Sequence, residues 1–87
     1  MSRDLFLHYY TDSKLRPVLV KIINEQLAEK TKEYFIDYYI KGYSQKFIAQ
    51  KYGTSQATIS QMTNKAADKV MRYFKYCLEV ENGKTVN

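Results

Sequence analysis

A short stretch in the second half of the chain, residues 55–65, is rich in amide and hydroxyl side chains. An amide can form two hydrogen bonds with the edge of an adenine base, and a small methyl group can contact the methyl group of thymine. Five residues of the stretch share one face of a helix, away from an apolar stripe: Gln56, Ala57, Ser60, Gln61 and Asn64. Because the stretch has no arginine, the side chain that most often binds guanine, these residues favour an A·T-rich site in DNA.

Hydroxyl and ammonium groups around this face could contact the phosphate backbone. A hydroxyl at a helix start can bind phosphate together with free backbone N–H groups and the helix dipole. Lysines neutralise phosphates and supply affinity without selecting sequence. The candidates are Ser44, Lys46, Lys51, Thr54, Ser55, Thr58 and Lys65. Ordinary solvent-exposed side chains remain the alternative interpretation of each lysine and of the amides.

Two helices are expected to position these groups. Ser44 predicts an N-cap for a helix over residues 45–52, and Gly53 predicts its end. Ser55 then predicts the cap of a second helix, which runs without glycine or proline from residue 56 to about residue 80.

The small and apolar residues of this helix pair have the spacing of a helix-turn-helix. Ala49 leaves room where the helices approach, and Ile59 and Met62 are expected to pack beneath Ile48. An ordinary helical hairpin is the alternative. The pattern predicts a helix-turn-helix motif at residues 44–65.

The first forty residues carry weaker signals. The run of residues 5–10 does not separate helix from strand. A helix is predicted to begin at Pro17 and to reach about Lys41, either unbroken or with a break near Asn24. Gly42 then predicts a stop in the left-handed conformation.

Length and composition limit the fold. The 87 residues (10.3 kDa) can bury one modest core, and only three glycines and one proline interrupt them. We predict an all-α bundle of four to five helices with a long C-terminal recognition helix. Residues 1–80 would form a single domain, with 1–24 as an N-terminal helical extension and 81–87 as a flexible tail.

The positive charge is concentrated in one segment. The formal net charge is +5, but residues 1–40 carry equal numbers of acidic and basic side chains. Residues 41–75 carry seven basic residues against one acidic residue, which is +6 in that segment. A solvated helix face is the simple explanation. Because this segment coincides with the predicted motif, we expect double-stranded DNA as the partner.

The chain resembles the C-terminal domain of bacterial sigma factors, which reads the promoter −35 element, and its helix-turn-helix relatives in the winged-helix-like superfamily. The resemblance covers about residues 27–78 and rests on Leu27, Lys32-Glu33, Tyr39, Gly42-Tyr43-Ser44, Ile48-Ala49, Tyr52-Gly53-Thr54-Ser55, Thr58-Ile59-Ser60, Lys65-Ala66 and Lys69. It implies a helical bundle whose second motif helix enters the major groove, and a role beside RNA polymerase. It does not imply a complete sigma factor, since no preceding segment resembles the promoter-melting region.

The expected function is that of a sequence-specific DNA-binding transcription regulator. No phosphate loop, CxxC pair or nucleophile with a partner histidine is present, so we expect neither an enzyme nor a metal or cofactor site. The alternative is an adaptor that contacts RNA polymerase or another protein without reading DNA. A cytoplasmic protein of bacterial, phage or mobile-element origin is expected, with no membrane association.

One recognition helix reads only a few base pairs, so the sequence also predicts a further partner, either RNA polymerase or a second copy of the chain. The aromatic segments 5–10 and 73–78 could form a self-association surface or simply complete the core. Cys77 is expected in the core or in that interface.

Overall fold

The computed structural model describes residues 1–81, and these fold as a run of helices. The segments are α1 (Arg3–Tyr10), α2 (Arg16–Gln26), α3 (Glu29–Phe35), the π-helical turn η1 (Ile36–Ile40), α4 (Gln45–Tyr52) and α5 (Gln56–Glu81). No β-strand occurs within residues 1–81, which confirms the predicted all-α bundle. Most of the predicted flexible tail, residues 82–87, lies outside the described residues.

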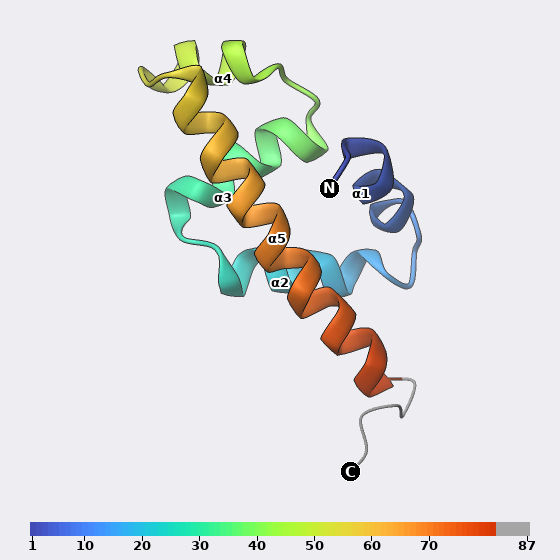
Figure 1. The fold of residues 1–87 in the computed structure, drawn as a ribbon. Coiled ribbons are helices and arrows are strands. Elements are labelled where there is room, and N and C mark those ends of the chain that lie inside the picture. Colours follow the sequence, from blue (N-terminus) through green and yellow to red (C-terminus); the bar gives the residue numbers. More distant parts are fainter. Residues whose placement is uncertain (82–87) are drawn as a thin grey trace.

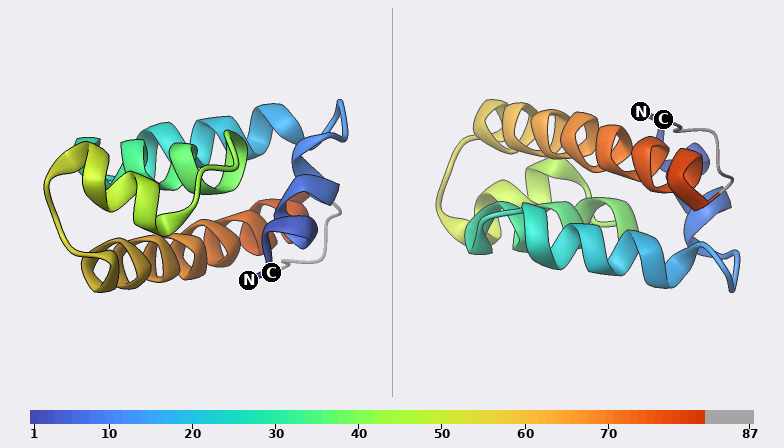
Figure 2. Two further views of the ribbon diagram at one scale, coloured as in Figure 1. Left: turned by 90° about the horizontal axis from the view of Figure 1, so that it is seen from above. Right: turned by 90° about the horizontal axis from the view of Figure 1, so that it is seen from below.

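The helices form two layers with one helix at the end. In Figure 1, α5 crosses the other helices diagonally, and in Figure 2 it forms one layer while α2, α3 and α4 form the other. α5 packs against α2, α3 and α4, and α1 contacts α2 and η1. The 26 residues of α5 make the molecule elongated, with extents of 46 × 23 × 18 Å.

α5 is amphipathic along its length. The predicted apolar stripe is buried: Ile59, Ala66, Val70 and Phe74 are each at most 3% exposed. Charged side chains lie between these apolar positions. Within residues 1–81, no helix is both long and apolar enough to cross a membrane.

The ambiguous run at residues 5–10 is helical. Ser2 caps α1, because its hydroxyl accepts the backbone N–H of Leu5 at 3.1 Å. Phe6 then lies fully inside the core, with its ring edge-on to Phe35 and tilted against Tyr39 at centroid distances of 5.4 and 5.5 Å. α1 is thereby part of the same hydrophobic core as α2, α3, η1 and α5.

The middle of the chain forms two helices, and the expected break near Asn24 was misplaced. Asn24 lies exposed inside α2, and the chain leaves the helix at Leu27 and Ala28, where the backbone is extended. Leu27 is 8% exposed and belongs to the core, so the burial of this side chain accompanies the break. α2 also begins at Arg16, one residue before the predicted start, with Pro17 in its first turn.

Gly42 ends this region as predicted, with φ at +79°. The position has a second requirement that the sequence did not reveal. A Cβ atom at Gly42 would lie 2.8 Å from the Arg3 guanidinium, which packs there from α1. Arg3 of the first helix therefore packs against the backbone just before the helix-turn-helix.

Candidate nucleic-acid interface

The helix-turn-helix has the caps that the sequence predicts. The Ser44 hydroxyl accepts the N–H of Phe47 at 3.0 Å, and the Ser55 hydroxyl accepts the N–H of Thr58 at 3.1 Å. Gly53 closes α4 in the left-handed conformation, with φ at +67°. These three residues fix the turn between α4 and α5.

A small separate cluster holds the two motif helices together. Ile48, Ala49 and Ile59 are at most 5% exposed and pack with Tyr34 of α3, while Met62 lies at the edge. The predicted packing of Ile59 and Met62 beneath Ile48 is confirmed. Because Tyr34 belongs to this cluster, α3 contributes to the packing of the two motif helices.

The predicted base-reading residues lie on the uncovered side of α5. Gln56, Ala57, Gln61 and Asn64 are exposed, and Ser60 is partly buried. All five lie in the first three turns of one long helix, and the free backbone N–H groups of its first turn lie at Gln56 and Ala57.

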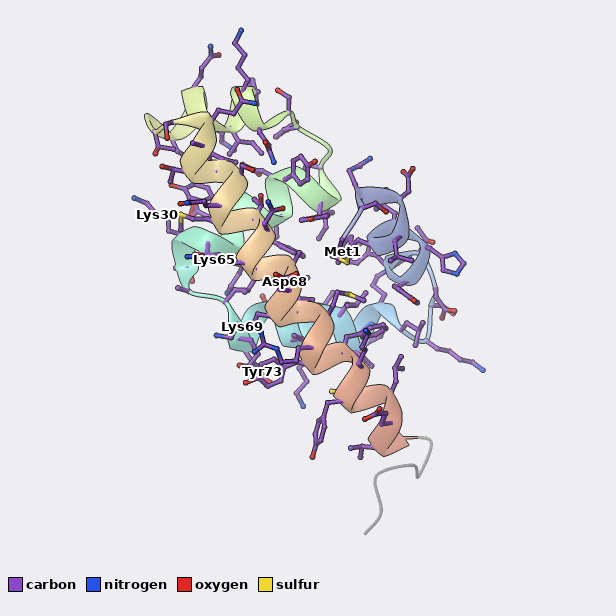
Figure 3. The ribbon with its side chains drawn as sticks, in the orientation of Figure 1. Met1, Lys30, Lys65, Asp68, Lys69 and Tyr73 are labelled. Atoms are coloured by element: carbon purple, nitrogen blue, oxygen red, sulfur yellow. The ribbon has the colours of Figure 1, made fainter. Side chains whose placement is uncertain are left out.

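Two neighbours delimit this surface, which we call the reading face. Thr63 was not predicted as a core residue, yet it is fully buried, and its hydroxyl is satisfied by donating to the carbonyl of Ile59 at 2.8 Å. Asp68 is exposed one turn beyond Asn64, on the side of α5 that faces Met1, as Figure 3 shows. Its carboxylate would repel phosphate, so contacts with DNA are expected to end before this turn.

The hydroxyl groups that could bind phosphate form a small relay at the start of α5. Ser55 donates its hydroxyl to Thr58 Oγ1 at 2.9 Å, which leaves the Thr58 hydroxyl proton free to donate outward. Thr54 precedes them in the turn and is partly buried. Ser44 and Lys46 lie exposed at the opposite end of α4, so the structure separates the predicted phosphate contacts into two groups.

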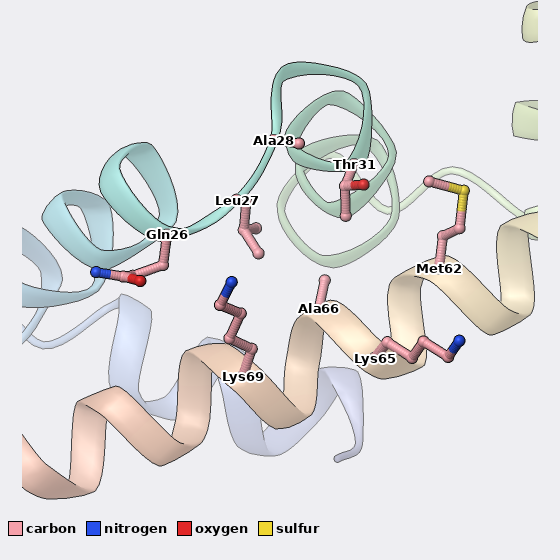
Figure 4. Close-up of a pocket in the computed structure, with 8 residues that line it drawn as sticks. All are labelled: Gln26, Leu27, Ala28, Thr31, Met62, Lys65, Ala66 and Lys69. Atoms are coloured by element: carbon pink, nitrogen blue, oxygen red, sulfur yellow. The ribbon is translucent and has the colours of Figure 1, made fainter.

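Lys65 and Lys69 differ in what they face. A groove of about 390 Å³ separates the α2–α3 junction from α5, with Leu27 and Ala66 among its lining residues. Both lysines line this groove, and Figure 4 shows Lys69 reaching across it toward Leu27, whereas the side chain of Lys65 extends along α5. Lys65 therefore keeps the exposed position that a phosphate contact requires.

Lys51 was predicted as a phosphate contact, but the structure places it in an ion pair. Its Nζ lies 3.0 Å from Oδ2 of Asp37, and the Tyr52 hydroxyl donates to the same oxygen at 2.9 Å. Lys41 approaches the other carboxylate oxygen at 3.6 Å. Asp37 is only 2% exposed, and sequence reasoning missed it. The available signal was that it is the single charged residue between Tyr34 and Ile40.

These contacts keep the Asp37 carboxylate ionised. Burial raises the pKa of Asp37, but hydrogen bonds from Lys51 and Tyr52 and the charges of Lys51 and Lys41 outweigh burial and bring the pKa below its usual value. The hydrogen bond to Asp37 raises the pKa of Lys51. Burial raises the pKa of Tyr52, so its hydroxyl stays protonated and continues to donate.

The ion pair predicts an acid-sensitive contribution to stability. Because the pKa of Asp37 is lower in the folded than in the unfolded chain, this contribution is complete above about pH 5 and is lost as the pH falls through the folded-state pKa. Asp37→Asn should therefore unfold at a lower temperature than wild type at neutral pH, and the gap should narrow below about pH 4. Thermal melts across this range test it, with Asp68→Asn as an exposed control for net charge. A gap that stays constant would contradict the assignment.

This helix-turn-helix has a match among known protein families. The family model for region 4 of sigma-70 matches residues 25–72, just over half of the chain. The chain belongs to the sigma-70 region 4 family. This family is a helix-turn-helix DNA-binding domain of transcription without enzymatic activity, and it interacts in general with DNA and RNA polymerase. Neither the curated proteins nor the solved structures include a match to the chain.

The region 4 match agrees closely with the resemblance predicted over residues 27–78. It begins at Glu25, the next-to-last residue of α2, and stops within α5 at Arg72. Every predicted base and phosphate contact lies inside it, as does Asp37. α1, most of α2 and the last turns of α5 lie outside the region 4 match.

Proposed function

We propose that this protein is a sequence-specific, double-stranded DNA-binding transcription regulator of bacterial, phage or mobile-element origin. The observation that carries the proposal is the reading face, which presents uncharged hydrogen-bonding groups at the free end of the second motif helix. An adaptor that contacts only protein would have no need of such groups there. Membership of the sigma-70 region 4 family supports DNA as the partner.

In the proposed complex the start of α5 enters the major groove. Gln56, Gln61 and Asn64 would bond adenine edges, and Ala57 would contact a thymine methyl group. Around them, the Thr58 hydroxyl and the exposed Lys65 would bind phosphates on either side of the groove.

Selection of bound duplexes from a random pool at physiological salt tests the proposal. We expect an enriched, A·T-leaning motif of a few base pairs for each bound copy. A triple variant with Gln56, Gln61 and Asn64 replaced by alanine is the control. It should retain salt-dependent binding to DNA but lose the enrichment, since its lysines are unchanged. If wild type enriches no sequence, the protein is not a specific regulator.

A second copy of the chain is the partner that we propose to extend the short site. Of the two predicted aromatic segments, residues 5–10 mostly complete the core, because Phe6 is buried and its neighbours pack on that core. At the far end of α5, by contrast, Tyr73, Tyr76 and Val80 are 38%, 58% and 49% exposed. They follow one another at helical spacing and form a stripe on one side of the helix.

Charge pattern favours self-association through this stripe. Arg72 and Lys75 precede Tyr76, and Glu79 follows it. An antiparallel pair of α5 helices centred near Tyr76 would set the basic residues of each copy against Glu79 of the other.

Tyr76→Glu is expected to abolish the dimer, because it removes an aromatic contact and places two acidic groups at the centre of the interface. Equilibrium sedimentation at tens of micromolar measures this, with wild type dimeric and the variant monomeric. Leu5→Glu, exposed on α1, is the matched control and should remain dimeric. A strictly monomeric wild type would rule out the self-association.

A further inference from the structure

We infer that Asp37 and Lys51 form a positioning pair for the reading face, and that Lys51 acts through Asp37 rather than by binding phosphate. The inference rests on the proposed DNA-binding function and assigns part of its specificity to a buried carboxylate that lies outside the motif. Asp37 is 2% exposed, and nothing in its position would let it touch DNA.

Asp37 is bonded to both ends of the first motif helix. Its backbone carbonyl accepts the N–H of Tyr43 at 2.9 Å, immediately before the Ser44 cap. Its carboxylate accepts hydrogen bonds from Lys51 and Tyr52, the last two residues of α4. One residue therefore ties both the segment just before α4 and the last two residues of α4 to η1, and Gly53 and the start of α5 follow directly.

The π-helical turn brings Asp37 to this position. In η1 the N–H of Lys41 donates to the carbonyl of Ile36 at 2.9 Å, five residues back, which widens the turn. The widened turn carries Asp37 on its buried side, facing α4. Such turns are frequent at functional sites, and here the turn supplies a charge to the helix that precedes the reading face.

Lys51 has more attractive partners within the protein than an exposed lysine has. Its Nζ lies 3.0 Å from Asp37, 5.1 Å from the ring centre of Tyr52 and 5.7 Å from that of Tyr43. A phosphate would have to draw it away from a buried carboxylate, which would leave that charge poorly compensated. Lys46, on the same helix, is exposed and forms no ion pair with any residue in the range 1–81.

Lys51→Ala and Lys46→Ala therefore separate positioning from phosphate binding. Affinity is measured for the selected operator and for a random duplex across a series of salt concentrations. For Lys46→Ala we expect both affinities to fall by the same factor, and the slope of log K against log salt to lose about 0.9. For Lys51→Ala we expect an unchanged slope and a roughly tenfold loss of preference for the operator over the random duplex.

Asp37→Asn gives the opposite change in salt dependence. Loss of the carboxylate releases Lys51 toward DNA. The slope of log K against log salt should then steepen by up to about 0.9, the value for one added phosphate contact, while preference for the operator falls. General destabilisation of the fold would not strengthen salt-dependent binding. Tyr52→Phe keeps the ring and removes one donor, and Lys51→Arg keeps the charge. These two variants should show a smaller loss of preference than Asp37→Asn and Lys51→Ala, respectively.

Each outcome of this series has one meaning. If Lys51→Ala lowers the slope and leaves preference for the operator unchanged, as Lys46→Ala should, Lys51 is a phosphate ligand and the positioning pair is refuted, while the proposed function stands. If Asp37→Asn leaves both quantities unchanged, the pair has no role in reading DNA. A wild-type protein that prefers no duplex would overturn the proposed function and this inference together.

Discussion

Gln61→Ala should weaken binding to the selected operator by about 1–3 kcal/mol, or roughly 5- to 150-fold, because a paired base contact is lost from the centre of the reading face. Binding to a random duplex should change little, since the side chain carries no charge. Fluorescence anisotropy with both duplexes, at one stated salt concentration, measures the two affinities.

Gln50→Ala is the matched control for this prediction. It removes the same exposed side chain from α4, outside the predicted contacts, and should bind the operator as wild type does. The comparison also separates the two functional classes. If Gln56, Ser60 and Gln61 all tolerate alanine without loss of preference, a polymerase-binding adaptor explains the fold better than a regulator does.

Phe6→Ala should lower the free energy of unfolding by about 3–5 kcal/mol. The Phe6 ring is fully buried and contacts Phe35 and Tyr39, so truncation would leave a cavity between α1 and the rest of the bundle. Small domains have total stabilities of only about 5–15 kcal/mol, so the variant would be partly unfolded at 37 °C. Urea denaturation followed by circular dichroism tests it.

The Phe6 variant also decides whether the first helices are an appendage. The sequence predicts a single domain of residues 1–80 with residues 1–24 as its helical extension, and we propose that this extension folds cooperatively with the motif. Leu5→Ala, at the exposed neighbouring position, should cost no more than about 0.5 kcal/mol. A Phe6→Ala protein with the same free energy of unfolding as wild type would contradict the proposal.

Local signals predicted the motif helices accurately because each boundary depends on one residue. Ser44, Gly53 and Ser55 define caps that need no tertiary information, and both predicted starts and the end of α4 are confirmed. The break at Leu27 could not be found in this way. The next helix, α3, begins at Glu29 without a side-chain cap, and Leu27 joins a core shared with other helices.

The residues of the candidate site likewise fall into those that local sequence signals predict and those that depend on the fold. Exposure of the reading face follows from helical periodicity alone, so Gln56, Gln61 and Asn64 were found from sequence. Lys51 has the same sequence signal as Lys46, and only the fold shows that Asp37 lies beside one and not the other. Contacts between residues that are 14 positions apart depend on a π-helical turn, for which the sequence carries no recognised pattern.

The continuity of α5 couples two distant surfaces through a single rigid rod. From Gln56 to Tyr76 the helix advances about 30 Å without a hinge, so the angle between the reading face and the Tyr73–Val80 stripe is set by residue count alone. One inserted residue would rotate one surface by about 100° relative to the other and shift it by about 1.5 Å. The number of residues between the two surfaces thus determines both their separation along α5 and their relative orientation about its axis.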